Sequence, residues 1–399
     1  MVFQMKVLHV IASVSEVRGG PSIAMRCLAR GLVRQGIEVD IATTDDNGAH
    51  RMEVPLGKPV RCDGATYWFF PVSAALYTLS FRLSSWLARN APKYDVVHVH
   101  GLFGYPQNAA SFLSAANGIP YVLRPVGTLG CWGMRNRRPH LKRLSLFCIE
   151  GPLLRRAAAV QYTTEQEKEE ASHLGFNRRA IVIPDPVDDI AEIDSASADA
   201  FLKFFHIAPA RPIIVFVGRL HPVKGLESLI DAFSLARAFC PDAVLVLAGD
   251  GEDDYVASLR QRASVLGLTG NIVWTGLLCH NLVPTALAAA TICVLPSHSE
   301  NFGIAAVEAM QAAKPVVVTT GVALHREITR AGAGVVVPPG ATSLAQALVT
   351  LMTNPKMRAS LGNRARQFAS TTFSTAAVTR QLITLYERML RYPRESAEA

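Results

Sequence analysis

The chain has 399 residues, half of them hydrophobic, and it carries 40 Lys and Arg against 32 Asp and Glu, a net charge of +8. This composition excludes a globally disordered chain, and the length exceeds the roughly 250 residues at which a single core stops growing, so two domains are expected. Seven scattered cysteines without a Cys-x-x-Cys pair argue against a disulfide framework or a zinc knuckle and favour the reducing cytoplasm.

Neither the N-terminus nor the longest apolar runs resemble membrane segments. Residues 5–14 lack the basic leader and the small-residue cleavage site of a signal peptide, and they predict a buried first strand instead. No run reaches the ~18 to 20 uninterrupted apolar residues that span a bilayer. We therefore expect a cytoplasmic protein that is soluble or peripheral on the cytoplasmic face of the inner membrane.

The positive charge is concentrated in the first half. Residues 1–183 contain 22 Lys and Arg against 13 Asp and Glu, whereas residues 184–399 contain 18 against 19. A basic half suggests contact with phosphate-rich material, either nucleic acid or an anionic membrane leaflet. An ordinary solvated basic surface is an equal alternative.

The first half alternates short Val- and Ile-rich runs with amphipathic stretches such as 21–35 and 106–117. The predicted strands are 6–12, 38–43, 66–71, 96–100, 121–123, 158–162 and 180–183. This alternation predicts βαβ units with a parallel sheet and right-handed crossovers. We predict an N-terminal Rossmann-like domain over residues 1–190.

Three loops that follow strands of this half carry candidate ligand contacts. Gly19 and Gly20 precede a predicted helix and would let the backbone approach a ligand closely, although a plain βα turn would look similar. His100 ends the strand 96–100 and is a candidate ligand contact, whereas His98 on the same strand is expected to pack inside. Arg124 opens a later loop and is a second candidate ligand contact.

A basic segment, residues 132–143, mixes cations with Trp132 and other apolar residues. Its cations are Arg135, Arg137, Arg138, Lys142 and Arg143. As a hypothesis, this segment docks on an anionic inner leaflet or on a pyrophosphate-bearing lipid acceptor. A solvated basic loop is an equal alternative.

The second half repeats the alternation after a linker that begins at Pro184-Asp185-Pro186. The predicted strands are 213–217, 243–248, 272–275, 292–295, 315–318 and 334–337. We predict a C-terminal Rossmann-like domain over residues 205–372, followed by a closing helix over 373–392 that returns toward the first domain.

The first strand of this half ends in two cations beside glycines. Gly218 and Arg219 follow residues 213–217, and Lys224 and Gly225 precede a predicted helix. Ligands of open α/β sheets bind outside the carboxyl ends of the strands, so both cations are expected there. Arg offers a fork for phosphate oxygens, and Lys offers a point charge.

Two glutamates mark the most informative turn. Residues 292–295 predict a short buried strand that Pro296 ends, and Gly303 opens a helix, so Glu300 lies on the turn and Glu308 inside the helix. The helix N-terminus presents unpaired N–H groups and a partial positive charge. The sequence therefore predicts an anionic ligand at this turn. A further acidic run at 250–254 is expected to begin a helix, not to bind a metal.

Together these residues resemble the retaining, metal-independent glycosyltransferases of the GT-B fold, glycosyltransferase family 4. The resemblance covers nearly the whole chain and rests on Gly19-Gly20, Gly218-Arg219 with Lys224-Gly225, Gly249-Asp250-Gly251, and Glu300 and Glu308 with Phe302-Gly303 between them. It implies an α/β GT-B fold in which two doubly wound Rossmann-like domains face a central cleft. It also implies a UDP- or GDP-sugar donor, with no metal and no other cofactor.

The resemblance also implies roles for individual residues. Arg219 and Lys224 would hold the donor diphosphate, Glu300 the donor sugar and Glu308 the ribose hydroxyls. Arg219, Lys224 and Glu300 are thus the expected catalytic residues. The other expected donor contacts are Gly19, Gly20, Leu278, Asn301, Phe302, Gly303 and Ile304. The first domain would bind the acceptor, with His100 and Arg124 as its expected contacts. The departing phosphate would itself help to remove the acceptor proton, so no protein base is assigned.

The expected activity is hexose transfer to a glycan or a lipid-linked acceptor, in bacterial surface or exopolysaccharide assembly. A sugar-nucleotide epimerase or a phosphorylase could share the same architecture. A nucleic-acid-binding or scaffold protein is the non-enzymatic alternative, but the basic residues form no recognisable nucleic-acid module, so no nucleic-acid partner is expected.

Overall fold

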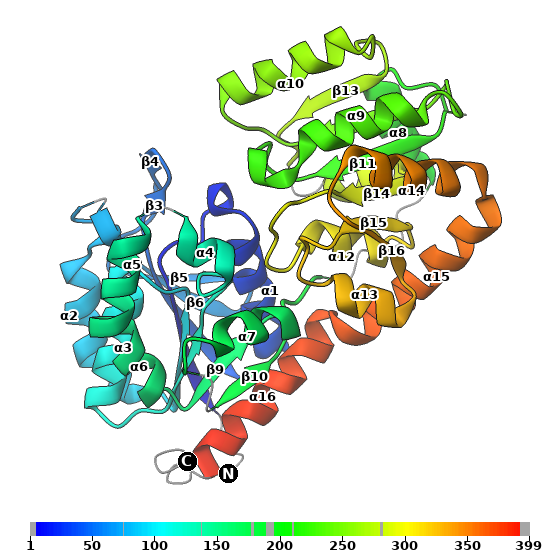
Figure 1. The fold of residues 1–399 in the computed structure, drawn as a ribbon. Helices are drawn as coiled ribbons and strands as arrows, with labels where there is room; N and C mark the ends of the chain where they lie inside the picture. Colours follow the sequence, from blue (N-terminus) through cyan, green and yellow to red (C-terminus); the bar gives the residue numbers. More distant parts are fainter. Residues whose placement is uncertain are drawn as a thin grey trace. The chain divides into compact units, whose positions relative to one another are not determined.

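A computed structural model describes residues 5–74, 76–136, 138–176, 179–188, 195–209, 211–279 and 282–391 (Figure 1). The chain forms two compact units. Unit 1 comprises Met1–Pro186 and Thr375–Ala399, and unit 2 comprises Val187–Ser374. The chain therefore passes from unit 1 to unit 2 and back again.

Unit 1 is built on an eight-stranded sheet in the order β10-β9-β8-β7-β1-β2-β6-β5. Its strands are β1 (Lys6–Ile11), β2 (Glu38–Thr44), β5 (Pro59–Cys62), β6 (Ala65–Phe70), β7 (Val96–His100), β8 (Tyr121–Arg124), β9 (Ala159–Tyr162) and β10 (Ala180–Val182). The strand pairs are parallel except β5 with β6, which is antiparallel. A two-stranded hairpin, β3 (Asp46–Asn47) with β4 (His50–Arg51), stands apart from this sheet.

Helices cover both faces of this sheet. They are α1 (Gly20–Arg34), α2 (Phe81–Asn90), α3 (Tyr105–Ala116), α4 (Cys131–Arg135), α5 (Pro139–Ser145), the π-helical turn η4 (Leu146–Glu150), α6 (Gly151–Arg156), α7 (Glu165–Ser172) and α16 (Thr375–Arg391). Successive residues of a strand point to opposite faces, so Val7 packs in a core with α1 and α16, whereas Leu8 packs in a second core with α2, α3 and α6. The sheet is buried on both sides, which is why its strands read as continuous apolar runs.

Unit 2 holds a six-stranded parallel sheet in the order β13-β12-β11-β14-β15-β16. Its strands are β11 (Ile213–Val217), β12 (Val244–Ala248), β13 (Ile272–Gly276), β14 (Ile292–Leu295), β15 (Val316–Thr319) and β16 (Gly334–Val337). The helices are α8 (Ser195–Phe204), α9 (Leu226–Ala236), α10 (Asp253–Val265), α11 (Val283–Ala289), α12 (Ile304–Gln311), α13 (His325–Ala331), α14 (Ala341–Thr353) and α15 (Pro355–Thr372). The acidic run at 250–254 begins α10 as predicted, with Glu252 as its N-cap.

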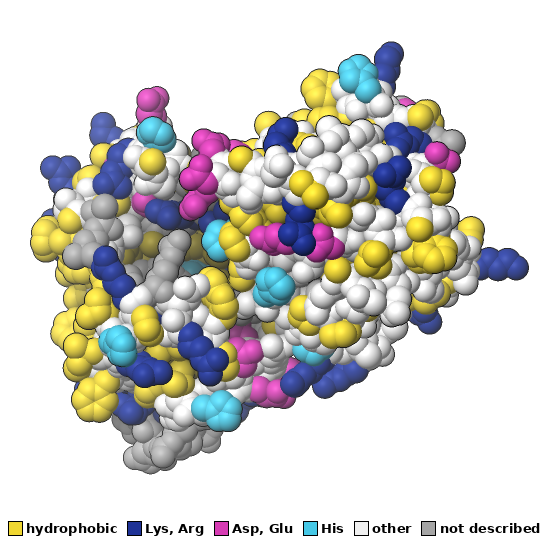
Figure 2. Space-filling view, turned by 45° about the horizontal axis from the view of Figure 1, so that its top comes forward, with side chains coloured by type: hydrophobic (Ala, Val, Ile, Leu, Met, Phe, Trp, Pro, Cys, Tyr) yellow, Lys and Arg dark blue, Asp and Glu magenta, His cyan; other side chains and the backbone are white. Residues whose placement is uncertain are grey.

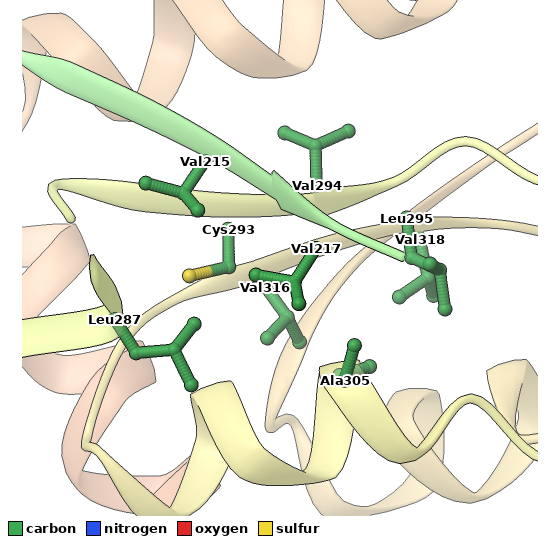
Figure 3. A pocket seen from close by; sticks show the side chains of 10 residues that line it. Val215, Val217, Leu287, Cys293, Val294, Leu295, Ala305, Val316 and Val318 are labelled. Atoms are coloured by element: carbon green, nitrogen blue, oxygen red, sulfur yellow. The ribbon is translucent and has the colours of Figure 1, made fainter. Parts of the chain in front are cut away.

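A small void in unit 2 lies between the sheet and helices α11 and α12 (Figure 3). Its lining is almost entirely aliphatic, with Val215, Val294 and Val316 on the strands and Ala305 on α12, and the sulfur of Cys293 is its main polar feature. Burial raises the pKa of the Cys293 thiol to about 12, so the thiol is neutral. This void is part of the hydrophobic core of unit 2.

The fold class predicted from the sequence, α/β with two parallel-sheet Rossmann-like domains, is confirmed. Four predicted strands, 96–100, 213–217, 292–295 and 334–337, have the observed bounds. No helix in the described part of the chain combines the length and the apolar character needed to cross a bilayer.

Candidate functional site

The sheet of unit 2 reverses its strand order between β11 and β14. From β11 the chain builds outward to β13 on one side, and then returns to add β14, β15 and β16 on the other. In open parallel sheets, ligands bind outside the carboxyl ends of the strands at such a switch. The loops that follow β11 and β14 carry Arg219, Lys224 and Glu300, so these three predicted residues lie at the same edge.

Backbone hydrogen bonds fix the Glu300 loop from two sides. The N–H of His298 donates to the carbonyl of Val223 at 2.8 Å, which joins this loop to the loop after β11. The N–H of Glu300 donates to the carbonyl of Gly321 at 2.9 Å, which joins it to the loop after β15. The position of Glu300 is therefore set by the backbone before any ligand arrives.

Lys224 and Glu300 form an ion pair across the two loops. Both side chains are partly accessible, with 17% and 20% of their surface exposed. Gly225 has φ 66°, and a Cβ there would lie 2.3 Å from the carbonyl oxygen of Pro296, so this close approach of the loops requires glycine. Arg219 is exposed, and the described residues give it no ion-pair partner.

Helix α12 begins beside Glu300 without a side-chain cap. Its N-cap, Gly303, has φ 91°, and no side chain accepts a hydrogen bond from the first turn. The free N–H groups and the helix dipole favour an anion at this end. The edge of unit 2 thus offers an ammonium, a guanidinium and a helix N-terminus, which are groups that bind a diphosphate.

Glu308 lies on α12 and is half-buried. Burial, and then the neighbouring carboxylate of Asp188, raises the pKa of Glu308 to about 7. A carboxyl with this pKa can exchange its proton near neutral pH, and it can accept hydrogen bonds from hydroxyl groups once it is ionised.

The other donor contacts predicted in unit 2 have different exposures. Phe302 is buried, and its ring packs edge-on against Phe373 at 5.5 Å between centroids, so only its backbone could reach a ligand. Asn301, Ile304 and Leu278 are half-buried. Donor contact by these residues stays a prediction.

In unit 1, Gly19 and Gly20 lie where the chain enters α1. Gly19 has φ 75° with open space around its Cα, and α1 begins at Gly20 without a side-chain cap. The preceding residue, Arg18, donates two hydrogen bonds to the carboxylate of Asp46, at 2.7 and 2.8 Å. The turn is thus both fixed and open, as a backbone contact to a ligand requires, and that contact stays a prediction.

The two predicted acceptor residues, His100 and Arg124, are buried. Arg124 is 0% exposed and forms an ion pair with Asp185, and its Nη1 lies 3.1 Å from Nδ1 of His100. His100 is 1% exposed, and its Nε2 lies 2.9 Å from Nδ1 of His9. In this structure their partners are other buried side chains, and acceptor contact stays a prediction.

The protonation of this cluster follows from Arg124. A guanidinium can only donate, so Nδ1 of His100 accepts. Burial, His98 and Arg124 lower the pKa of His100, so His100 is neutral, carries its proton on Nε2 and donates to Nδ1 of His9. Burial, and then the Arg124 charge, lowers the pKa of His9 to about 3, so His9 is neutral as well.

The third histidine, His98, is buried as predicted, and it joins α16 to the sheet. Its Nδ1 lies 2.6 Å from the hydroxyl of Tyr386. The nitrogens of His9, His98 and His100 lie within 4.8 Å of one another, which is a spacing that could hold a metal ion. However, hydrogen bonds occupy Nδ1 of both His9 and His100, and an ion would lie beside the buried Arg124 cation. The cluster therefore fits a neutral hydrogen-bonded chain better than a metal centre.

A buried carboxylate supports the loop that follows Arg124. Glu167 accepts hydrogen bonds from the N–H of Gly127 at 2.5 Å and from the N–H and hydroxyl of Thr163, both at 2.7 Å. Val126, in the same loop, has φ 55°, which is strained for a β-branched residue. Strain of this kind is often held at functional loops. Val126 therefore marks this loop as a candidate contact through its backbone, even though its side chain cannot donate a hydrogen bond.

Sequence reasoning did not single out His9, Glu167 or Tyr386. His9 occupies a core position of an apolar strand, and its partners follow only from the pairing of β1 with β7, where it lies opposite His98. Glu167 follows an N-cap threonine at the start of α7, so it resembles an ordinary first-turn acid. No periodic signal in the sequence distinguishes these roles.

Comparisons with known proteins agree on both halves of the chain. The family described as "Glycosyl transferases group 1" matches residues 199–368, and the "Glycosyl transferase 4-like domain" matches residues 19–186. A 2-deoxystreptamine N-acetyl-D-glucosaminyltransferase of Streptomyces fradiae is 28% identical over 320 residues, 75% of this chain and 74% of the relative. A D-inositol 3-phosphate glycosyltransferase of Jonesia denitrificans is 25% identical over 397 residues, 93% of this chain and 91% of the relative.

A solved structure has the same fold. It is the crystal structure of Anabaena HepE in complex with UDP and glucose, with a TM-score of 0.76 and 20% sequence identity, and the likeness covers 96% of this chain and 100% of that chain.

Proposed function

Since the chain belongs to the GT-B glycosyltransferases of the GT4 type and is an enzyme that transfers sugars, we propose that it moves a hexose from a UDP- or GDP-sugar to a glycan or a lipid-linked acceptor, with retention of anomeric configuration. Bacterial surface or exopolysaccharide assembly is the process that we propose for it.

The observation that carries this proposal is the edge of unit 2. The Lys224–Glu300 pair, the exposed Arg219 and the uncapped start of α12 follow two strands that flank the switch point. Breaking the bond between a sugar and a nucleoside diphosphate develops negative charge on the departing phosphate. Fixed cations and N–H groups can stabilise that charge without reorganising during the reaction. These residues therefore supply the main requirement of the proposed chemistry.

Each side chain then has a proposed role. Arg219 and Lys224 bind the diphosphate, and Lys224 exchanges part of its contact with Glu300 for contact with phosphate. Glu300 turns to the hydroxyls of the donor sugar, and ionised Glu308 accepts hydrogen bonds from the ribose. The departing phosphate helps to remove the acceptor proton, so this chain needs no separate base in the proposed mechanism.

The named relatives and the solved structure support a nucleotide-sugar donor. The Streptomyces and Jonesia relatives are named as sugar transferases, and the Anabaena structure contains UDP and glucose. We extend the donor class, but not the acceptor, from them to this chain.

The experiment that tests the proposal incubates the full chain with UDP- and GDP-hexoses and with a lipid-pyrophosphate sugar acceptor. We expect a glycosylated product whose new linkage, followed by NMR, keeps the anomeric configuration of the donor. A nucleotide sugar whose own sugar is isomerised without any acceptor would instead establish an epimerase. An inverted linkage would refute the proposed retention.

A further inference from the structure

One face of unit 1 exposes an unusual number of large apolar side chains. We call it the α2–α6 face, and it is formed by α2, α3, α5, η4 and α6. Phe147 is 81% exposed, and five further side chains are 44–61% exposed: Phe81, Phe112, Leu141, Leu144 and Ile149. Figure 2 shows hydrophobic and basic side chains along its left side, where Figure 1 draws these helices. Contiguous apolar surface of this kind usually marks an interaction site.

The apolar residues of the α2–α6 face are continuous across its helices. The rings of Phe81 and Tyr105 lie 6.2 Å apart, edge to face, and the Ser84 hydroxyl lies 2.7 Å from the Tyr105 hydroxyl, which joins α2 to α3. A groove lined by α2, α3, η4 and α6 leads from Tyr105 to Phe112 and Ile149. On α5 and η4, Leu141, Leu144 and Phe147 recur every three residues and so share one side of the helical segment.

The charges of this face have one sign. The described residues expose Arg82, Arg89, Arg143, Arg155 and Arg156 on its helices. The only acidic residue of these five elements, Glu150, is 1% exposed and accepts a hydrogen bond from Asn108. Between residues 64 and 164 the whole sequence contains 11 Lys and Arg and only two acidic residues.

We propose that the α2–α6 face docks on an anionic phospholipid bilayer. Arginines near an anionic leaflet are attracted by the surface potential, worth about 1 kcal/mol each, while aromatic and aliphatic side chains enter the interface. A second copy of the chain fits this face poorly. A two-fold dimer would place the same arginines opposite each other with no exposed acidic partner. A bilayer offers an apolar interior for the apolar side chains and anionic headgroups for the arginines.

The α2–α6 face includes only part of the basic segment 132–143. Leu141 and Arg143 belong to the α2–α6 face. Trp132 instead lies on α4, whose first N–H, that of Cys131, donates to Glu170 at 2.9 Å. Arg137 lies outside the described residues. The proposal rests on the proposed lipid-linked acceptor for its purpose, but vesicle binding can be measured without any acceptor.

The test measures co-sedimentation of the full chain with vesicles of phosphatidylcholine containing about 30% phosphatidylglycerol, and with vesicles of phosphatidylcholine alone. We expect binding to the anionic vesicles, weakened by 0.5 M NaCl, and at least tenfold weaker binding to the neutral ones. Phe112→Ser with Phe147→Ser, and separately Arg82→Glu with Arg143→Glu, should each lower the partition coefficient at least tenfold. Phe239→Ser and Arg330→Glu, at exposed positions of unit 2, are the matched controls and should bind as the unchanged protein does.

Three outcomes would overturn the proposal. They are no binding of the unchanged chain, equal binding by the face variants, or a dimer in sedimentation velocity that Phe147→Ser dissociates while vesicles are not bound. Donor turnover separates this inference from the proposed function. The face variants should keep their turnover with a soluble acceptor, whereas Lys224→Ala should lose turnover and keep vesicle binding.

Discussion

At the level of single residues, the proposed function relies on a cation, Lys224, that already has a partner. Lys224 is paired with Glu300, so in the proposed mechanism the donor phosphate competes with a carboxylate for the ammonium. An exposed or half-buried pair contributes only about 0 to 1 kcal/mol to stability, so this competition costs little. The pair fixes the positions of both side chains at the edge of the sheet and contributes little to the stability of the fold.

This gives the first prediction. Lys224→Ala and Glu300→Gln should each lower kcat/KM for sugar transfer by about 10²- to 10³-fold, because each removes a group that faces developing charge or the donor sugar. The melting temperature should change by no more than a few degrees. Steady-state kinetics and calorimetry provide the two measurements. Lys203→Met, at an exposed position of α8, is the control, and full activity in either site variant would refute the assignment.

For Glu308, we predict that replacing the carboxyl raises the stability of the protein and lowers its affinity for the donor. Its pKa of about 7 lies above the usual value near 4.5. The folded carboxyl therefore keeps its proton where the unfolded one has lost it. Stability of the unliganded protein is complete below about pH 4.5 and is lost as the pH rises through 7.

Replacing Glu308 should remove that loss. Glu308→Gln should be about 1–3 kcal/mol more stable than the unchanged protein at pH 8 and within about 1 kcal/mol of it at pH 5, because the amide does not ionise. Its affinity for the nucleotide-sugar donor should fall, because an ionised acceptor for the ribose is lost. Urea unfolding at both pH values and calorimetric titration test this. A variant that is less stable at pH 8 would contradict it.

Sequence reasoning was most effective for residues whose position follows from a local pattern of strand, glycine and helix. A glutamate on a strand–glycine–helix turn and a lysine before a glycine at a strand's end are visible locally, and the structure has Glu300 and Lys224 in those places. Burial of the His100 side chain depends on neighbouring strands and on α16, which no local pattern encodes. The role of Asp185 as the partner of Arg124 is non-local for the same reason.

At the level of elements, the buried cluster around Arg124 and the three histidines joins β1, β7 and β8 to the two segments where the chain crosses between the units. Asp185 precedes the first crossing and pairs with Arg124 on β8. Tyr386 lies on α16, after the second crossing, and contacts His98 on β7. A hydrogen bond with Gln161 partly offsets the lowered pKa of His98, and the charge of Glu167 does the same for the pKa of Arg124. We expect the cluster to set the stability of unit 1.

The free energy of unfolding at acid pH should show the contribution of this cluster. Burial lowers the pKa of His9 to about 3 and lowers those of His98 and His100, whereas the unfolded chain binds protons near pH 6.5. Stability is therefore complete above about pH 6.5 and is lost as the pH falls, by about 1.4 kcal/mol per pH unit for each such histidine. His9→Gln should reduce this slope by about one histidine's share in urea unfolding between pH 6 and 4. His140→Gln, at an exposed position, should leave the slope unchanged, and an unaltered slope in His9→Gln would contradict the account.

The contact of α16 with the sheet gives a separate prediction. Tyr386→Phe should destabilise the protein by about 1–3 kcal/mol, because it leaves Nδ1 of the buried His98 without its partner. Val378, Leu382 and Leu385 still pack in the core, so the helix should stay folded. Thermal unfolding measures the loss, and circular dichroism checks the helix content. A change below about 0.5 kcal/mol would show that the hydrogen bond does not anchor α16.

The elements themselves were largely predictable. Central strands buried on both faces read as apolar runs, so β7, β11, β14 and β16 were predicted with their observed bounds. The antiparallel edge strand β5 was missed, because its residues are mostly exposed and show no apolar run. The short helices between Cys131 and Arg156 were missed as well, since their apolar residues face outward and break the usual helical pattern.

For the whole molecule, the two units differ in charge as the sequence indicated. Unit 1 carries the basic surface, which we propose docks on a bilayer, and unit 2 carries the edge that we propose binds the donor phosphates. The doubled alternation of strands and helices predicted two Rossmann-like folds. The arrangement of apolar and basic residues into one face of unit 1 was not predictable, because it depends on how α2, α3 and η4 pack together.

We propose that the edge of unit 2 binds a nucleotide sugar through Arg219 and Lys224. The most direct test is thermal stabilisation across a panel of UDP- and GDP-sugars, since a ligand that binds only the native state stabilises it by about 2.7 kcal/mol at 100 times Kd. We predict that at least one nucleotide sugar raises the melting temperature by several degrees, and that Arg219→Met with Lys224→Met abolishes this shift while Lys203→Met preserves it. The absence of a shift with every nucleotide sugar, or an equal shift in the double variant, would contradict the account.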